Sequence, residues 1–304
     1  MSTPLDNRAH FETEGMPALY YAADKASTAS QSLYLKLLLA VLICTVAGPM
    51  FLVLAPLFPN HLARFRYLAG AALLAALVIT GRIKESRKER EWYGARAVAE
   101  SVKTSAWRYA MAAEPYLSAL SAQEVDRLFL DNLKGVLRDA KELNYSAGSG
   151  DNSKPQITDA MRALRSKSWA ERMQVYVEQR IQGQRRWYSG KAHQSSRWEN
   201  IYFGVIIILQ LVAMLTAFAF AVWSGMTVNL TGMITSMVAA LFVWLQAKRY
   251  QETAQSYSVT SHELGFVEET SKHVKSESEF ASFVADSENA MSREHTLWVA
   301  RRRG

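Results

Sequence analysis

Two long stretches of this chain contain no charged residue, and they constrain its fold more than any other feature. The first covers residues 37–58 and the second covers residues 201–247. A helix rises ~1.5 Å per residue, so a run the length of the first extends about 33 Å, enough to cross a hydrocarbon core of ~30 Å. The second run is long enough for two crossings, and Ser224, Gly225 and Asn229 near its middle predict the turn between them.

A shorter apolar block at residues 67–81 follows the first run. Alone it is short for a span, but Arg64 and Arg66 precede it, and long side chains of this kind can reach the headgroups while their stems stay in lipid. We therefore expect this span to begin near Leu62, although a buried helix of a soluble domain is the alternative. The predicted fold is an all-α integral membrane protein with two transmembrane hairpins, hence four spans, and a cytoplasmic bundle of long helices.

Positive charge predicts the orientation of the spans. Basic residues cluster directly after the second and fourth spans, at Arg82, Lys84, Arg87, Lys88 and Arg90 and at Lys248 and Arg249. The positive-inside rule then places both termini in the cytoplasm, so we expect a multi-pass protein of the inner membrane. Residues 82–200 carry the excess positive charge, which could bind nucleic acid; because it lies next to the spans, topology and anionic lipid explain it better. We expect a lipid bilayer and no nucleic acid as partner.

Residues 89–116 predict one long helix that continues from the second span and ends at Pro115. Its apolar seam follows 3–4 spacing and consists of Trp92, Ala95, Ala99, Val102, Ala106, Tyr109 and Ala113. The opposite side carries Arg96, Glu100, Lys103 and Glu114. Alanines let a neighbouring helix approach closely, so we expect a packing face opposite a charged face, and we interpret the helix as a lever that couples cytoplasmic packing to the membrane hairpin.

The remaining segments predict the domain organisation. Ser121 and Glu124 form a capping box, and residues 146–155 read as a flexible linker. Thr158 is the expected N-cap of a helix of roughly 40 residues that runs to the third span. The predicted segments are an N-terminal cytoplasmic segment (1–32), a first two-span unit (33–116), a helix and linker (117–156) and a second unit (157–304).

Three further sets of residues are candidate packing or pore positions. Ala72, Ala76 and Thr80 place small side chains four residues apart in the second span, which favours close helix packing. Gln210, Thr231 and Thr235 are candidate pore-lining residues. Trp187 and Tyr188 repeat the Trp92-Tyr93 pair at an offset of 95 residues and are further candidates for helix packing. Chance similarity between helical segments is the alternative explanation for this repeat.

The segments at residues 92–116, 176–192 and 283–300 bear a family resemblance. The first contains WY followed by AESVKTSAWRYAMAAEPY just after a two-span unit, and it resembles the SLATT family of SMODS and SLOG-associating two-transmembrane effector domains. The second half, with YVEQRIQGQRRWYSGKA and FVADSENAMSREHTLWVA, is similar to another branch of that family. The resemblance implies a bacterial antiviral defence system in which a nucleotide-signalling or sensor partner triggers a pore-forming effector, with abortive infection as the outcome.

Residues typical of enzymes do not gather in recognisable patterns. The histidines are His10, His61, His193, His262, His273 and His295, and none forms an HExxH or paired-ligand spacing. No glycine-rich phosphate loop follows a strand, and the single cysteine, Cys44, lies inside the first apolar run. We therefore expect no enzymatic activity, no cofactor and no metal site.

Three functions remain open from the sequence. They are a membrane-permeabilising effector, a constitutive ion channel or transporter, and a non-conducting sensor or scaffold. Transporters carry intramembrane charges or broken helices, and here Lys36 lies only at the edge of the first span while Gly48-Pro49 could break it. Polar residues in the spans are scattered, so a pore made by one chain would be dry. Conduction would require several copies, and we expect a homo-oligomer.

Overall fold

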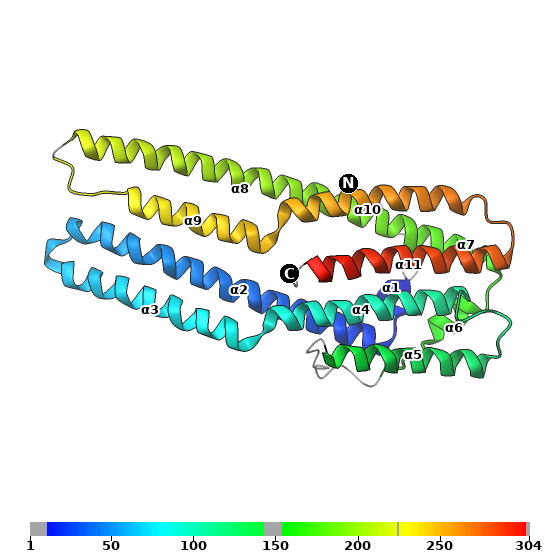
Figure 1. Ribbon diagram of the computed structural model, residues 1–304. Coiled ribbons are helices and arrows are strands. Elements are labelled where there is room, and N and C mark those ends of the chain that lie inside the picture. The colour runs from blue at the N-terminus through cyan, green and yellow to red at the C-terminus, as the bar shows by residue number, and fades with distance from the viewer. Residues whose placement is uncertain (1–10, 143–153, 224, 302–304) are drawn as a thin grey trace. The chain divides into compact units, whose positions relative to one another are not determined.

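The structure is a computed structural model that describes the backbone of residues 11–142, 154–223 and 225–301. Within these ranges every regular element is helical (Figure 1). The α-helices are α1 (Phe11–Glu14), α2 (Ala18–Leu54), α3 (Leu62–Ser86), α4 (Lys88–Met111), α5 (Ala122–Glu142), α6 (Asp159–Arg165), α7 (Trp169–Val175), α8 (Gln182–Val222), α9 (Thr231–Lys248), α10 (Tyr250–Ser271) and α11 (Glu277–Arg301). A π-helix, η3 (Tyr176–Ile181), joins α7 to α8, and the short 3₁₀ helices η1 (Ala55–Leu57) and η2 (Pro59–His61) lie between α2 and α3.

The chain divides into two compact units, each built from separate stretches of sequence. Unit 1 comprises Met1–Gln31, Glu89–Tyr188 and Val259–Gly304, and unit 2 comprises Ser32–Lys88 and Ser189–Ser258. The boundaries fall inside α2, α8 and α10, and at the first residue of α4. Helices α2, α8 and α10 therefore contribute residues to both units, and α4 gives only Lys88 to unit 2.

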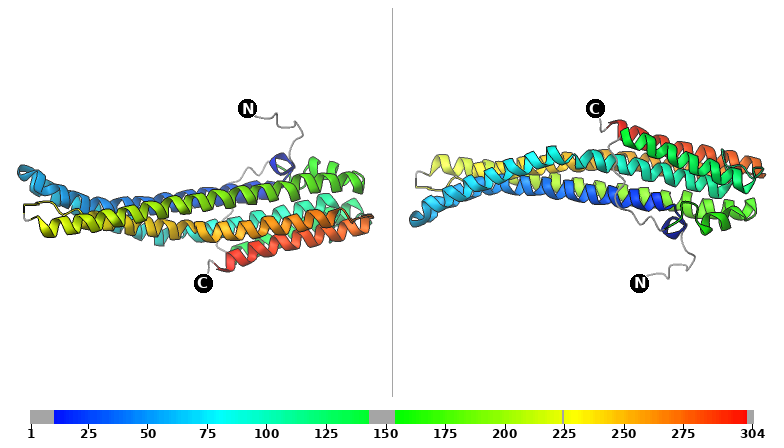
Figure 2. Two further views of the ribbon diagram at one scale, coloured as in Figure 1. Left: turned by 90° about the horizontal axis from the view of Figure 1, so that it is seen from above. Right: turned by 90° about the horizontal axis from the view of Figure 1, so that it is seen from below.

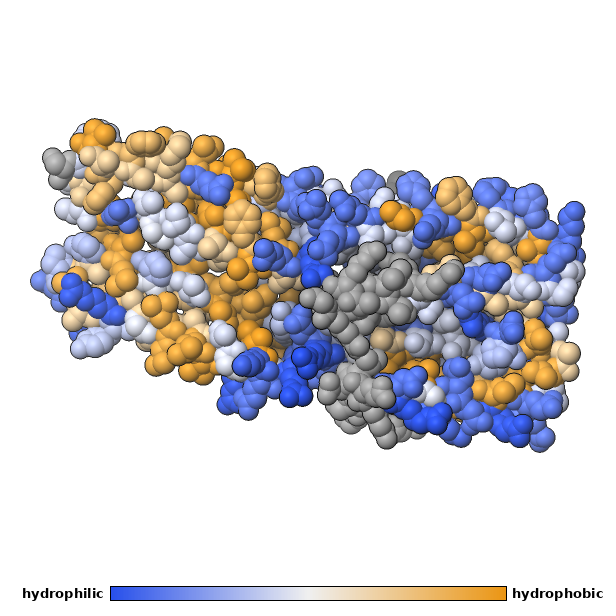
Figure 3. Space-filling view, in the orientation of Figure 1, coloured by the Kyte–Doolittle hydropathy of each residue, from blue (hydrophilic) through white to orange (hydrophobic). Residues whose placement is uncertain are grey.

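Unit 2 contains the apolar parts of four helices that are long and apolar enough to cross a membrane. In this unit the segments of α2, α3, α8 and α9 run side by side (Figures 1 and 2). Their large side chains point outward, as at Leu77 and Phe218, and hydrophobic residues dominate the surface over these helices (Figure 3). Small residues such as Ala69, Ala76 and Ala213 are buried instead. A surface of this kind is stable in lipid rather than in water, and the chain is a multi-pass membrane protein.

The hairpin turns agree with the predicted spans. Helix α3 begins at Leu62, as the flanking arginines predicted. The second turn lies between α8 and α9, where the Asn229 side-chain oxygen accepts a hydrogen bond from the Thr231 amide at 3.0 Å. Ser224 lies outside the described residues, as do residues 1–10 of the predicted N-terminal segment and residues 146–153 of the predicted linker.

The predicted continuity between the second span and the helix that follows it is wrong, and the fourth span is interrupted in the same way. Arg87, with φ 47° and ψ 24°, separates α3 from α4, and Arg249, with φ 48° and ψ 45°, separates α9 from α10. A left-handed residue cannot extend a right-handed helix, so each span ends at its arginine. Helix α4 also ends at Met111 rather than at Pro115, because Ala112 has φ 52° and terminates it first.

The predicted helix of roughly 40 residues before the third span is interrupted. Thr158 is its N-cap, as expected, and accepts a hydrogen bond from the Met161 amide at 3.2 Å. The helix then ends after α6, and Ser168 with Glu171 forms a new capping box that starts α7. The π-helix follows before α8 begins. The predicted capping box of Ser121 and Glu124 at the start of α5 is present.

Helix α4 lies at the centre of the hydrophobic core of unit 1. Side chains from α1, α5, η3 and α11 belong to the same buried cluster. The ring of Trp107 in α4 lies 4.7 Å from Phe11 and 5.7 Å from Tyr176, centroid to centroid. Tyr109, two residues further along α4, packs on Phe129 of α5 at 5.1 Å. Aromatic contacts thus join α4 to neighbours that are distant in sequence.

Candidate functional site

The predicted α4 seam is buried along its whole length. Trp92, Ala95, Ala99, Val102, Ala106 and Tyr109 are each at most 8% exposed. On the opposite face, Arg96 pairs with Glu100 at 2.6 Å. Lys103 belongs to the same charged side, since its ammonium lies 2.9 Å from Glu100, but it is also buried. Helix α4 therefore buries more of its circumference than the seam alone predicted.

The other predicted packing residues have mixed environments. Trp187 in α8 is 40% exposed, and its ring contacts that of Tyr188 at 5.0 Å. In α3, Ala76 is buried and accepts a hydrogen bond from the Thr80 hydroxyl at 2.8 Å, while Ala72 is half-buried. Small residues do bring α2 and α3 together nearby, since a Cβ added at Gly48 would lie 3.0 Å from the Leu73 side chain.

The three candidate pore-lining residues do not share one face in unit 2. Gln210 lies on the exposed side of α8. The Thr235 hydroxyl donates to the backbone carbonyl of Thr231 at 3.0 Å, and the Thr231 hydroxyl lies 3.4 Å from that of Thr216. Both threonines of α9 thus use hydrogen-bond partners within the helical hairpin.

The most unusual chemistry of the chain is a buried charge cluster in unit 1. Arg180 and Glu288 are 2% and 0% exposed. They form a bidentate ion pair, in which Arg180 Nε lies 2.8 Å from Glu288 Oε1 and Arg180 Nη2 lies 2.8 Å from Glu288 Oε2. The Tyr176 hydroxyl donates to the same carboxylate at 3.0 Å. Arg180 also donates to Glu12 at 3.0 Å, and the Trp107 indole N–H donates to that oxygen at 3.0 Å. We call these five residues the Arg180 cluster.

Local backbone geometry positions this cluster. Tyr176 and Arg180 both belong to the π-helix, and Glu288 approaches them from α11. A π-helix contains an extra residue per turn, which shifts the side chains that follow and occurs frequently at functional sites. Neither the π-helix nor the ion pair is visible in local sequence periodicity, because Arg180 and Glu288 are 108 residues apart.

Burial and neighbouring charges shift the pKa values of Arg180, Tyr176 and Glu12. Burial disfavours the Arg180 cation, but the neighbouring Glu288 carboxylate outweighs this effect and raises the pKa of Arg180 well above its ordinary value. Burial, together with the Glu288 charge, raises the pKa of Tyr176 well above 10. Burial also acts against ionised Glu12, yet Lys103 and Arg180 lower its pKa below its usual value. These shifts favour a charged Arg180, a neutral Tyr176 and an ionised Glu12 at neutral pH.

Two more arginines hold the C-terminal end of α4. Arg165 of α6 donates to the carbonyl oxygens of Tyr109 at 2.9 Å and Tyr116 at 2.7 Å. Arg172 of α7, itself buried, donates to the Met111 carbonyl and to the Glu277 carboxylate of α11. A helix leaves its last carbonyls without intrahelical partners, and cations stabilise that end. Both arginines donate to carbonyl oxygens at the point where Ala112 terminates α4. The sequence analysis predicted no role for either arginine.

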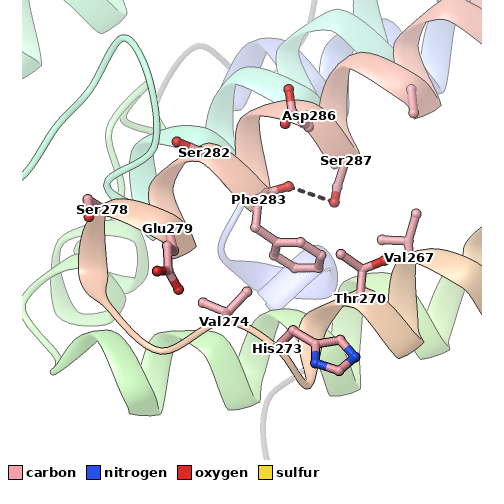
Figure 4. A pocket seen from close by; sticks show the side chains of 11 residues that line it. Val267, Thr270, His273, Val274, Ser278, Glu279, Ser282, Phe283, Asp286 and Ser287 are labelled. Carbon is pink, nitrogen blue, oxygen red and sulfur yellow. Dashed lines mark hydrogen bonds between the residues drawn. The ribbon is translucent and has the colours of Figure 1, made fainter.

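A cavity of about 710 Å³ lies between α10 and α11 in unit 1 (Figure 4). Thr270 lines it from α10, His273 lines it from the turn after α10, and Glu279, Phe283 and Asp286 line it from α11. The ring of Phe283 also lies 6.2 Å from the Tyr176 ring, so the cavity borders the Arg180 cluster. Its two carboxylates and the absence of Lys or Arg among its described lining residues disfavour anionic ligands.

Comparison with protein families identifies the chain. A model of the SMODS and SLOG-associating 2TM effector domain 3 matches residues 17–173, more than half of the sequence. The chain belongs to the SLATT family. A second SLATT model, of the SMODS and SLOG-associating 2TM effector domain 1, matches residues 176–298, so one chain contains two SLATT domains. No curated protein and no solved structure matches this chain.

The two SLATT domains are interleaved in the structure. The first supplies α4 and α5 to unit 1, and the second supplies η3 and α11 to it. The Arg180 cluster joins Trp107 of the first domain to Tyr176, Arg180 and Glu288 of the second through Glu12. Unit 2 likewise contains one hairpin from each domain. Neither SLATT domain is therefore a compact body of its own.

Both SLATT domains repeat one order of elements. In each, a long helix leads to a turn, a span, a left-handed arginine and a further helix. Arg87 and Arg249 mark this repeat at an offset of 162 residues. The repeated Trp-Tyr pair, at an offset of 95 residues, does not follow it: Trp92 lies after its hairpin in α4, and Trp187 lies before its hairpin in α8.

Proposed function

We propose that this chain is an inner-membrane effector of a bacterial antiphage conflict system, which oligomerises and permeabilises the membrane when triggered. The observation that carries the proposal is the match of two effector domains to residues 17–173 and 176–298 of a chain with four membrane-spanning candidates. Both termini and unit 1 lie in the cytoplasm in this proposal, as the basic residues beside α3 and α9 support.

Unit 1 acts as the receiver of the trigger. Its core contains elements of both SLATT domains, and the Arg180 cluster and the arginines at the end of α4 fix their packing. Helices α2 and α8 include residues of unit 1 and of the spans. A nucleotide-signalling or sensor protein that changes the packing of unit 1 therefore biases the hairpins between two arrangements, with the α4 seam as lever.

The decisive experiment measures membrane potential and uptake of a membrane-impermeant dye in cells expressing the protein, with and without phage infection. An effector depolarises the membrane only after infection. A constitutive channel or transporter would depolarise the membrane without phage, and a non-conducting sensor would leave the potential unchanged in both conditions. Either of these outcomes contradicts the proposal.

A matched pair of variants tests the lever. Ala99→Glu places a charge at a seam position that is 1% exposed, whereas Glu100→Gln changes the neighbouring charged face. We expect Ala99→Glu to change dye uptake and phage protection while the protein remains in the membrane fraction, and Glu100→Gln to have a much smaller effect. If Ala99→Glu inserts and shows the dye uptake and phage protection of the parent protein, α4 supports the fold but does not act as a lever.

Orientation has its own test. In a Cys44→Ser background the chain contains no other cysteine, so one cysteine introduced in the linker at residues 146–155 reports on a single position. We expect it to resist a membrane-impermeant thiol reagent in intact cells and to react after lysis. Labelling in intact cells, with a cysteine at Pro59 protected, would reverse the orientation.

A further inference from the structure

Gln210 places a polar side chain in the middle of an apolar membrane segment. Between Ile201 and Val222 the side chains of α8 that can form hydrogen bonds are Tyr202, Gln210 and Thr216. Gln210 is the tenth residue of this segment, so it lies about 13 Å along the helix from Ile201. That depth is near the centre of a hydrocarbon core ~30 Å thick.

The amide of Gln210 has no hydrogen-bond partner among the described residues, whereas the Thr216 hydroxyl donates to the Ala213 carbonyl at 2.9 Å. Gln210 is exposed on the outside of unit 2 and is too short to reach the headgroups from this depth. In lipid an unpaired amide is strongly unfavourable, because no water is present to replace the missing bonds. In a single copy, the Gln210 amide therefore lacks the polar partner that it needs in lipid.

The surroundings of Gln210 indicate what that partner is. Phe203, Ile207 and Met214 lie on the same side of α8 at helical spacing and are 43–55% exposed. Ala217 and Ala221 continue this face toward the turn and are also exposed. Ile206 and Ala213 are buried and face the rest of unit 2. The face thus combines one polar group, bulky apolar residues and small residues that allow a second helix to approach closely.

We propose that this face of α8 binds the same face of α8 in a second copy of the chain, with the two Gln210 side chains hydrogen-bonded to each other. A carboxamide has both donors and an acceptor, so it is complementary to itself across a two-fold axis. In the pair each amide donates one hydrogen bond and accepts one, and the polar group no longer faces lipid. The inference rests on the self-association in the proposed function, but it does not depend on permeabilisation.

Cysteine cross-linking in membranes tests the contact directly. In the Cys44→Ser background, Ala217→Cys reports on the proposed face and leaves Gln210 intact. Leu215→Cys is the matched control, because it lies two residues away on the other exposed side of α8 and is 62% exposed. We expect oxidation to convert the Ala217→Cys protein to a disulfide-linked dimer on non-reducing gels, with little dimer from Leu215→Cys.

A second substitution tests Gln210 itself. Adding Gln210→Leu to the Ala217→Cys reporter should weaken association by about threefold to thirtyfold, the effect of one interhelical hydrogen bond in a membrane. Gln210→Asn keeps the carboxamide and should therefore retain part of the association. Unchanged cross-linking in Gln210→Leu, equal cross-linking at Leu215→Cys, or labelling of Ala217→Cys by a water-soluble thiol reagent would overturn the proposal.

Parallel dye-uptake measurements separate this inference from the proposed function. Cross-linking at Ala217→Cys without permeabilisation after infection supports the interface and contradicts the effector mechanism. Permeabilisation without cross-linking supports the effector mechanism and contradicts this interface.

Discussion

Helices α4 and α10 occupy equivalent places in the two SLATT domains, yet one is central and the other peripheral. Each follows a span and a left-handed arginine. Helix α10 buries Thr260, Leu264 and Ser271, and at the offset of 162 residues these correspond to Val98, Val102 and Tyr109, which α4 also buries. Helix α4 buries a second row beside this one. The repeat thus preserves one packing row and changes the other.

The second row explains the difference in packing. In α4 it contains Ala95, Ala99, Ala106 and Ala110, each at most 1% exposed. At the same offset they correspond to Tyr257, Ser261 and Glu268 of α10 and to Lys272, which directly follows α10. Small apolar residues allow a helix to approach on that side, whereas Glu268 pairs with Arg185 at 2.6 Å near the surface. The order of elements is the same in both domains. The differences at these four positions therefore explain why α4 is a core helix and α10 is a surface helix.

The largest expected effect comes from placing a charge on each helix. Ala106→Glu buries a carboxylate at a position that is 0% exposed, and it should destabilise unit 1 by several kcal/mol or prevent folding. Val259→Glu in α10 changes a residue that is 57% exposed and should shift stability by less than about 0.5 kcal/mol. Thermal unfolding in detergent, followed by circular dichroism, measures both. Similar shifts would show that α4 and α10 are equally central.

Ion pairs beside the two helices should differ in the same direction. Arg180→Leu leaves Glu288 buried without its cation and should cost about 3–5 kcal/mol. Arg185→Leu removes the exposed partner of Glu268 in α10 and should cost less than about 1 kcal/mol. The double substitution Arg180→Leu with Glu288→Leu should recover much of the stability lost by the first. Failure of that recovery would mean that the pair provides more than mutual neutralisation.

Within α10, the single buried row should carry most of the stabilisation. Leu264→Ala truncates a side chain that is 3% exposed and should cost about 2–3 kcal/mol. Phe266→Ala removes a larger ring that is 73% exposed and should cost less than about 0.5 kcal/mol. The same detergent unfolding assay applies. A larger cost for Phe266→Ala would reveal a partner on the outer face of α10.

The smallest effects are expected where the two helices begin. Glycine adopts positive φ without strain, so Arg87→Gly should stabilise the protein by up to about 1 kcal/mol. Arg249→Gly should stabilise the protein less, because it also removes the exposed ion pair of Arg249 with Glu252 at 3.2 Å. Destabilisation of both variants would show that the arginine side chains matter more than the backbone conformation.

Hydropathy and periodicity in the sequence predicted the spans and the α4 seam, because both depend on local patterns of residue type. The start of α3 at Leu62 and the caps at Ser121 and Thr158 followed from flanking charges and capping residues. The breaks at Arg87 and Arg249 could not be predicted, since arginine has no preference for positive φ. Long-range pairs are invisible for a different reason: nothing near Arg180 indicates a carboxylate 108 residues away.

The interleaving of two unlike SLATT domains in one chain has a consequence for stoichiometry. Had the domains been separate proteins, the pairing of their hairpins would depend on how much of each the cell made. Covalent linkage replaces that bimolecular step with an intramolecular one of high effective concentration. Every copy then brings one hairpin of each kind to unit 2. In the proposed self-association, only the association of whole chains then depends on concentration, and one gene product sets that concentration.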